Sequence, residues 1–145
     1  RVEGSYREGG GGGREWAHRP LEAPAMAAAP LLEPKALELL RMLDRDQPGS
    51  FSQFVRMFVH EAPDLVRKME QAQQAGDVDE LGKSAHYLRS AALAMGASQL
   101  VEVCHGLEHP DMQDLHGEEM ADRLNQLRRA VRNALILLLQ EVPQI

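Results

Sequence analysis

Apolar side chains recur every three to four residues from Leu31 almost to the end of the chain, and this period constrains the fold most. Such spacing lines up the apolar residues on one face of a helix, whereas a half-buried strand alternates with a period of two. No segment shows that alternation. Because long amphipathic helices joined by short connections pack as antiparallel neighbours, the pattern predicts an all-α, up-down bundle.

The first two helices are bounded by local signals. Glu33 precedes Pro34, which suits the first helical position, and this short helix is expected to end at 47–49. Ser50, with Gln53 three residues later, predicts a capping box at the start of the second helix. Pro63 should kink or restart that helix. The expected inward residues are Leu37, Leu40, Leu43, Phe51, Phe54, Val55, Phe58, Ala62, Leu65, Val66 and Met69.

Three further helices follow by the same reasoning. The third helix is expected to begin at Asp77 and to end at Gly96. Ser98 is expected to cap the fourth helix, which would end at 109–110. The last helix should run from near Asp114 to about Gln140. The apolar stripe of the third helix consists of Val78, Leu81, Ala85, Leu88, Ala92 and Met95. The stripe of the last helix includes Met120, Leu124, Leu127, Val131, Ala134, Leu135 and Leu138.

Residues 1–30 differ from the rest of the chain. They hold a run of five glycines at 9–13 and three prolines in an Ala-rich stretch, with no helical or strand period. This composition predicts a flexible linker or a leader left by cloning, followed by one domain over residues 31–145. Because the chain begins with Arg1, we expect a fragment or a processed protein.

Charge and cysteine content exclude several classes of partner and site. The net charge is -6 and there is no long basic run, which argues against nucleic acid and against membrane contact by this domain. The one cysteine, Cys104, excludes a disulfide framework and fits a reducing, cytoplasmic location. The apolar run at 134–139 is far too short to span a membrane.

His86 does not belong to the apolar stripe of its helix. When residues are placed at 100° intervals, His86 points away from that stripe, toward solvent. Its neighbours on the outward face are Gly82, Lys83, Ser90 and Leu93. Gly82 and Ser90 lie one turn before and after His86, and both are small, which indicates that a large partner approaches the ring. We expect these four neighbours to form a partner-binding surface.

An exposed imidazole suits phosphoryl transfer because a neutral ring nitrogen can attack phosphorus in line. Arg89 follows three residues later, so its side chain can reach the same surface and offset the charge of a phosphorylated ring. The spacing alone is more typical of an ordinary solvated histidine on a helix surface.

The string around His86 resembles the bacterial histidine phosphotransfer (HPt) family. The matching residues are 85–92, Ala-His-Tyr-Leu-Arg-Ser-Ala-Ala, then Gly96-Ala97, Leu100, and Cys104 to Glu108. The helix order extends this resemblance over about residues 31–140. Three positions depart from the family pattern: Arg89 replaces a usual Lys, Ser90 a frequent Gly and Ala91 a frequent Ser.

The resemblance implies a four-helix bundle with a short additional N-terminal helix. It implies that His86 accepts a phosphoryl group from an aspartate of one receiver domain and passes it to an aspartate of another, with Arg89 in support. The implied partners are response-regulator receiver domains and, as a further candidate, a hybrid sensor kinase. A free-standing protein and the C-terminal domain of such a kinase both remain open, and the Gly/Pro-rich leader favours the second.

No nucleotide-binding signature is present. The glycines at 9–13 lack the strand, helix and Lys of a phosphate-binding loop. We therefore expect no ATP-dependent kinase activity, no cofactor and no metal of the chain's own, with Mg²⁺ supplied by the receiver.

Two alternatives compete with this interpretation. His105 and His109 are four residues apart, with Cys104 and Glu108 nearby, a spacing that could bind a metal on a continuous helix. The main alternative is a non-catalytic helical-bundle adaptor that binds or inhibits a signalling partner while His86 stays idle. Replacement of His86 by Gln separates the two functions.

Overall fold

The computed structural model of the chain describes residues 32–142, and within this range every regular element is helical. The elements are α3 (Pro34–Asp46), α4 (Ser50–Ala75), α5 (Val78–Met95), α6 (Ser98–His105), the 3₁₀ helix η1 (Met112–Asp114) and α7 (Glu118–Glu141). The predicted all-α class is confirmed. The expected leader, residues 1–30, lies outside the described residues.

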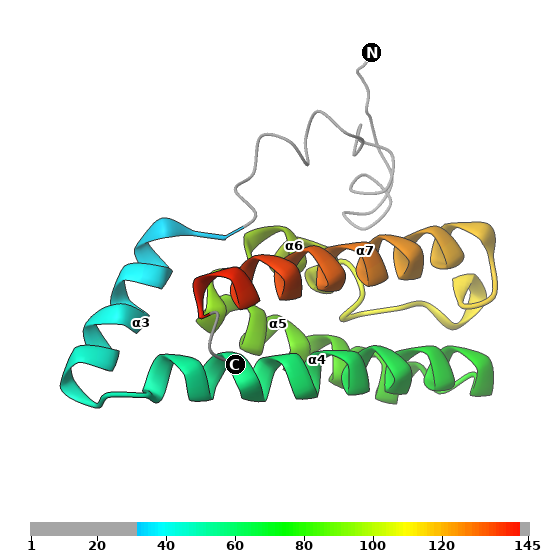
Figure 1. Cartoon of the computed structure of the whole chain (residues 1–145). Helices are drawn as coiled ribbons and strands as arrows, with labels where there is room; N and C mark the ends of the chain where they lie inside the picture. The colour runs from blue at the N-terminus through cyan, green and yellow to red at the C-terminus, as the bar shows by residue number, and fades with distance from the viewer. Residues whose placement is uncertain (1–31, 143–145) are drawn as a thin grey trace, which may run out of the picture. The chain divides into compact units, whose positions relative to one another are not determined.

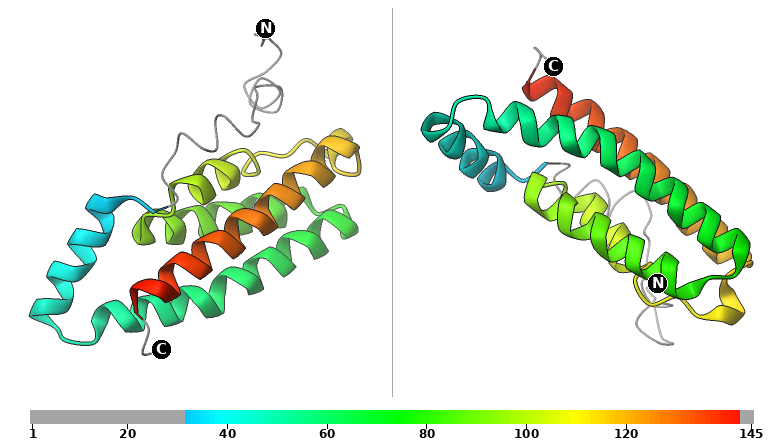
Figure 2. Two further views of the ribbon diagram at one scale, coloured as in Figure 1. Left: turned by 45° about the horizontal axis from the view of Figure 1, so that its top comes forward. Right: turned by 90° about the horizontal axis from the view of Figure 1, so that it is seen from below.

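The four helices α4 to α7 form an up-down bundle in which successive helices alternate in direction (Figure 1). α5 packs between α4 and α6, and α7 returns alongside α4 and α6, so the four helices close on one another. Figure 2 shows the long helices α4 and α7 side by side in a second view. The additional N-terminal helix that the resemblance implied is α3, which contacts α4 and α5 at one end of the bundle.

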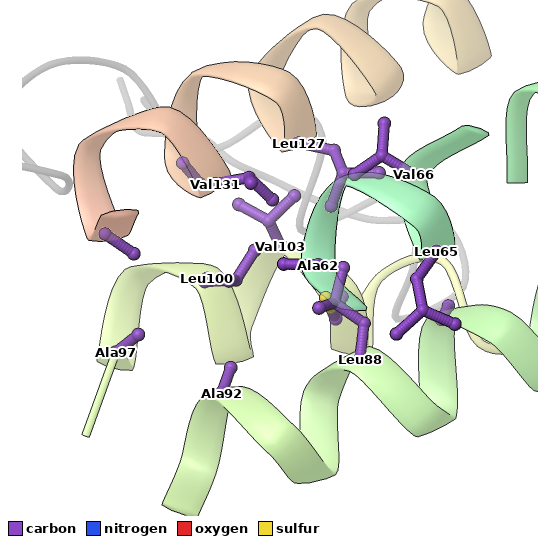
Figure 3. Close-up of a cluster of buried hydrophobic side chains, with 14 of the residues drawn as sticks. Ala62, Leu65, Val66, Leu88, Ala92, Ala97, Leu100, Val103, Leu127 and Val131 are labelled. Carbon is purple, nitrogen blue, oxygen red and sulfur yellow. The ribbon is translucent and has the colours of Figure 1, made fainter. Parts of the chain in front are cut away.

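The core is mainly aliphatic, because only 4% of the residues are aromatic, although Phe51 and Phe58 are buried in it. Figure 3 shows side chains of all four bundle helices converging on one cluster. Ala62 and Val66 come from α4, Leu88 and Ala92 from α5, Leu100 and Val103 from α6, and Leu127 and Val131 from α7. All the predicted inward residues of the four bundle helices are buried or packed against the core. Leu43 of α3 was also predicted to face inward, but it is 38% exposed.

The start of α4 is capped differently from the sequence prediction. Ser50 is the first helical residue and makes no capping bond; Gly49, in the left-handed conformation with φ 91°, precedes it. The cap comes from Asp44 of α3, whose Oδ1 accepts hydrogen bonds from the backbone N–H groups of Gly49 (3.0 Å) and Phe51 (3.1 Å). The two N–H groups of the predicted capping box, those of Ser50 and Gln53, instead donate to the backbone carbonyls of Gln47 and Gly49.

Asp77 is the N-cap of α5 as predicted, and its side chain accepts from the N–H of Glu80. The corresponding prediction for Ser98 is wrong, because Ala97 is the N-cap of α6 and no side chain caps it. Helix α4 also passes through Pro63 without a break, so the predicted restart does not occur.

The connection between α6 and α7 is longer than the periodicity predicted. α6 ends at His105 and α7 begins at Glu118, with only the short η1 between them. Leu107 and Leu115 of this connection are fully buried, so the chain leaves the helix but stays anchored in the core. Among residues 32–142, none of the helices combines the length and the hydropathy that a membrane span requires.

Candidate functional site

His86 lies midway along α5 on its outward face, and its side chain is 62% exposed. The opposite face of the same helix carries Leu81, Ala85, Leu88 and Ala92, all fully buried. The predicted exposure of His86 is confirmed. The cause is the helical period, which turns the apolar stripe of α5 toward the core and leaves the imidazole of His86 in solvent.

Glu108 is the partner of His86, and sequence reasoning did not assign it this role. Its side chain is 8% exposed, and its Oε1 lies 3.3 Å from Nδ1 of His86. Its other oxygen, Oε2, accepts a hydrogen bond from Nε of Arg89. One buried carboxylate thus connects the imidazole and the guanidinium that α5 presents one turn apart.

This contact determines which ring nitrogen of His86 carries the proton. A carboxylate can only accept a hydrogen bond, so the neutral imidazole must donate through Nδ1–H. Nε2 then keeps its lone pair and faces away from the carboxylate. The hydrogen bond at Nδ1 therefore sets the tautomer and leaves Nε2 available as a nucleophile.

Glu108 remains a carboxylate despite its low exposure. Burial raises its pKa, but the hydrogen bonds from Arg89 and His86, together with their charges, outweigh burial and hold the pKa of Glu108 below its ordinary value. The acceptor for His86 is therefore ionised at neutral pH.

A groove of about 510 Å³ opens beside His86, between α5 and the connection that follows α6. The residues that line it are Val78, Asp79, Gly82, Lys83, His86, Tyr87, Glu108, His109 and Pro110. Lys83 places a cation on this side of the imidazole. Arg89 is not among the lining residues; its Nε donates to Glu108.

The structure confirms the predicted exposure of three of the four residues of the partner-binding surface and contradicts that of the fourth. Lys83, Ser90 and Leu93 are exposed around His86, as predicted, and their contact with a partner stays a prediction. Gly82 is buried, and its predicted exposure is wrong. The backbone of Glu108 covers it: a Cβ built on Gly82 would lie 2.4 Å from the carbonyl oxygen of Glu108. The helical period of α5 cannot predict that the backbone of another segment, at Glu108, covers this helix at Gly82.

The alternative metal pair lacks the geometry that motivated it. Because α6 ends at His105, His109 is not one helical turn further along the same helix. Within residues 32–142, no three His, Cys, Asp or Glu side chains come together as a metal site. Cys104 is fully buried, and burial, with a smaller effect of Glu108, raises the pKa of its thiol to about 12.

Comparisons with known proteins bear on the family and the fold of the chain. The Hpt domain family matches residues 53–134, which include α5 with His86 and the segment with Glu108. A search of curated proteins found no match. The fold is similar to the crystal structure of histidine-containing phosphotransfer protein B (HptB) from Pseudomonas aeruginosa PAO1, with a TM-score of 0.68 and 24% sequence identity over 81% of this chain and 99% of that one. Since the family match spans more than half of the chain and the same helices form the bundle, this chain belongs to the Hpt domain family.

Proposed function

We propose that this protein is a phosphorelay intermediate in which Nε2 of His86 receives a phosphoryl group from the aspartyl phosphate of one receiver domain and passes it to an aspartate of another. Membership of the Hpt family supports the general role in histidine phosphotransfer. The observation that carries the specific assignment is the exposed imidazole whose Nδ1 is bound by the buried carboxylate of Glu108.

The chemistry follows from this tautomer. The lone pair of Nε2 forms the N–P bond as the P–O bond to the receiver aspartate breaks, and that aspartate leaves as a carboxylate. The ring, still protonated at Nδ1, then carries a positive charge. The carboxylate of Glu108 stabilises that charge at 3.3 Å, and the reverse step regenerates the neutral ring. No proton has to move during either transfer.

The two cations near His86 take different roles in this proposal. Arg89 acts through Glu108: its guanidinium holds the carboxylate in place and keeps it ionised. Lys83 lines the groove beside the imidazole and is the cation best placed to meet the oxygens of the incoming phosphoryl group. This differs from the expectation that Arg89 offsets the phosphoryl charge directly. We expect Mg²⁺ to be held by the acidic pocket of the receiver.

The receiver approaches across the exposed face of α5. Ser90 lies one turn beyond His86 and is small, and Leu93 is 62% exposed although it is apolar. Tyr87, also exposed, lines the same groove as Lys83. An apolar surface around a reactive group favours contact with a protein partner, because docking removes that surface from water.

Transfer can be tested with receiver domains phosphorylated by acetyl phosphate. Wild-type protein mixed with such a receiver and Mg²⁺ should take up the label, and it should stay unlabelled with ATP alone. The label should be lost in acid and survive base, as expected of a phosphohistidine. His86→Gln should abolish labelling with unchanged helix content, since the side chain is exposed.

The matched control is His105→Gln, which changes another exposed histidine and should label normally. Labelling of His86→Gln would refute the assignment. A wild-type protein that binds receivers and never takes up the label would instead support the adaptor function.

A further inference from the structure

Gly82 is a buried glycine inside a helix, one turn before His86. A glycine there is unfavourable for the helix, since alanine loses less conformational freedom on folding. Its surroundings explain why alanine would not fit. A Cβ built on Gly82 would lie 2.4 Å from the carbonyl oxygen of Glu108 and 3.5 Å from Cδ of Pro110. The missing side chain lets the backbone of Glu108 lie directly against α5.

This contact fixes where the Glu108 side chain begins. From that point the carboxylate reaches Nδ1 of His86 and Nε of Arg89, which both lie on α5. The distance from the Glu108 backbone to α5 therefore sets the geometry of the hydrogen bond to the imidazole. An added methyl group would push the carbonyl outward, because a contact of 2.4 Å with a backbone atom cannot be relieved by rotating a side chain.

We propose that Gly82 is a positioning residue for phosphoryl transfer: by admitting the Glu108 backbone against α5, it holds the Glu108 carboxylate at His86 Nδ1 and thereby keeps the lone pair on Nε2. The consequence for transfer rests on the function proposed above. The consequence for the imidazole tautomer is independent of that function and is measurable in the unphosphorylated protein.

The neighbouring contacts make a local shift the expected response. Leu107, next to Glu108, is fully buried, and Arg123 donates to the carbonyl of Gly106 at 3.1 Å. These contacts anchor the start of the segment away from Gly82. Gly82→Ala should therefore displace Glu108 without releasing the whole connection.

The test is Gly82→Ala, read by ¹⁵N NMR of the His86 ring. The wild-type ring should be mostly protonated at Nδ1, and the variant should shift toward the tautomer protonated at Nε2. Transfer from a receiver phosphorylated by acetyl phosphate should slow, at most to the level of Glu108→Ala, roughly 5- to 10-fold. The matched control is Gly117→Ala, whose added Cβ would meet no atom closer than 3.6 Å, and its His86 signals should match wild type.

A double-mutant cycle separates positioning from a general structural effect. In a Glu108→Ala background the clash with the backbone carbonyl remains, so Gly82→Ala should alter thermal stability as it does in the wild type. It should change neither the His86 ring signals nor the transfer rate any further, because no carboxylate is left to position.

If Gly82→Ala alone does not fold, the double variant Gly82→Ala/Pro110→Ala removes the proline ring that the added Cβ would also meet, at 3.5 Å, and lifts the proline restriction on the backbone of this segment; the same loss of Nδ1 protonation is expected. Wild-type ring signals in a folded Gly82 variant, or equal changes with and without Glu108, would overturn the proposal. Failure of the wild type to accept the label would refute the proposed function alone, since the ring signals still decide the role of Gly82.

Discussion

Replacement of Glu108 by alanine tests the link between the buried carboxylate and the reactivity of His86. The change removes the acceptor at Nδ1 and the partner of Arg89 in one step. His86 then loses the bond that selects its tautomer and the charge that stabilises the phosphorylated ring. Transfer should slow, while His86 itself stays exposed and present.

The expected size follows from the geometry. A hydrogen bond to a charged group contributes about 1.5–3 kcal/mol when well formed. The bond to His86 is long, 3.3 Å, and the ring is 62% exposed, so water weakens it. A loss of about 1–1.4 kcal/mol in the transition state is therefore reasonable, and it corresponds to roughly 5- to 10-fold slower transfer. Glu108→Gln keeps an acceptor oxygen without the charge and should fall between the two proteins.

The assay is single-turnover transfer from a labelled receiver, followed by rapid quenching. Receiver affinity, measured in parallel by calorimetry, should stay within about twofold of wild type, because the Glu108 side chain is only 8% exposed and is a small part of any docking surface. A transfer rate equal to wild type in a folded Glu108→Ala protein would refute the reasoning. So would a slower rate explained entirely by weaker receiver binding.

Three further outcomes concern stability and reactivity. The pKa of Glu108 is lowered in the folded state, so the stability that its carboxylate contributes is complete above the ordinary pKa of 4.5 and is lost as the pH falls through the folded value. In urea unfolding, the free energy of unfolding of the wild type should therefore approach that of Glu108→Gln in this acid range. A difference between the two proteins that does not change with pH would contradict this. Leu88→Ala removes a fully buried side chain of α5 and should lower the free energy of unfolding by about 2–5 kcal/mol, whereas a loss below about 1 kcal/mol would argue against the packing described. Cys104 is buried with a thiol pKa of about 12, so iodoacetamide at pH 8 should modify it only after unfolding, and rapid alkylation of the native protein would show that the thiol is accessible.

Local rules were sufficient for much of this protein. The apolar period predicted the helices and their inward faces, because burying a stripe on each helix is the main source of stability of such a bundle. The same period placed His86 in solvent, and Asp77 as the cap of α5 needed only the residue three positions on. The resemblance around His86 predicted the family that the comparison then showed.

Contacts between distant segments decided the rest. The cap of α4 is Asp44 of the preceding helix, although Ser50 has the better local pattern. Gly82 is outward on its own helix and yet buried, because the connection after α6 crosses it. His86 and Glu108 are 22 residues apart in sequence. A helical period distinguishes the buried face of one helix from its exposed face, so it can show that the imidazole of His86 is exposed. It does not show which segment crosses that face, and only the packing of the α6–α7 connection on α5 brings a carboxylate to the imidazole.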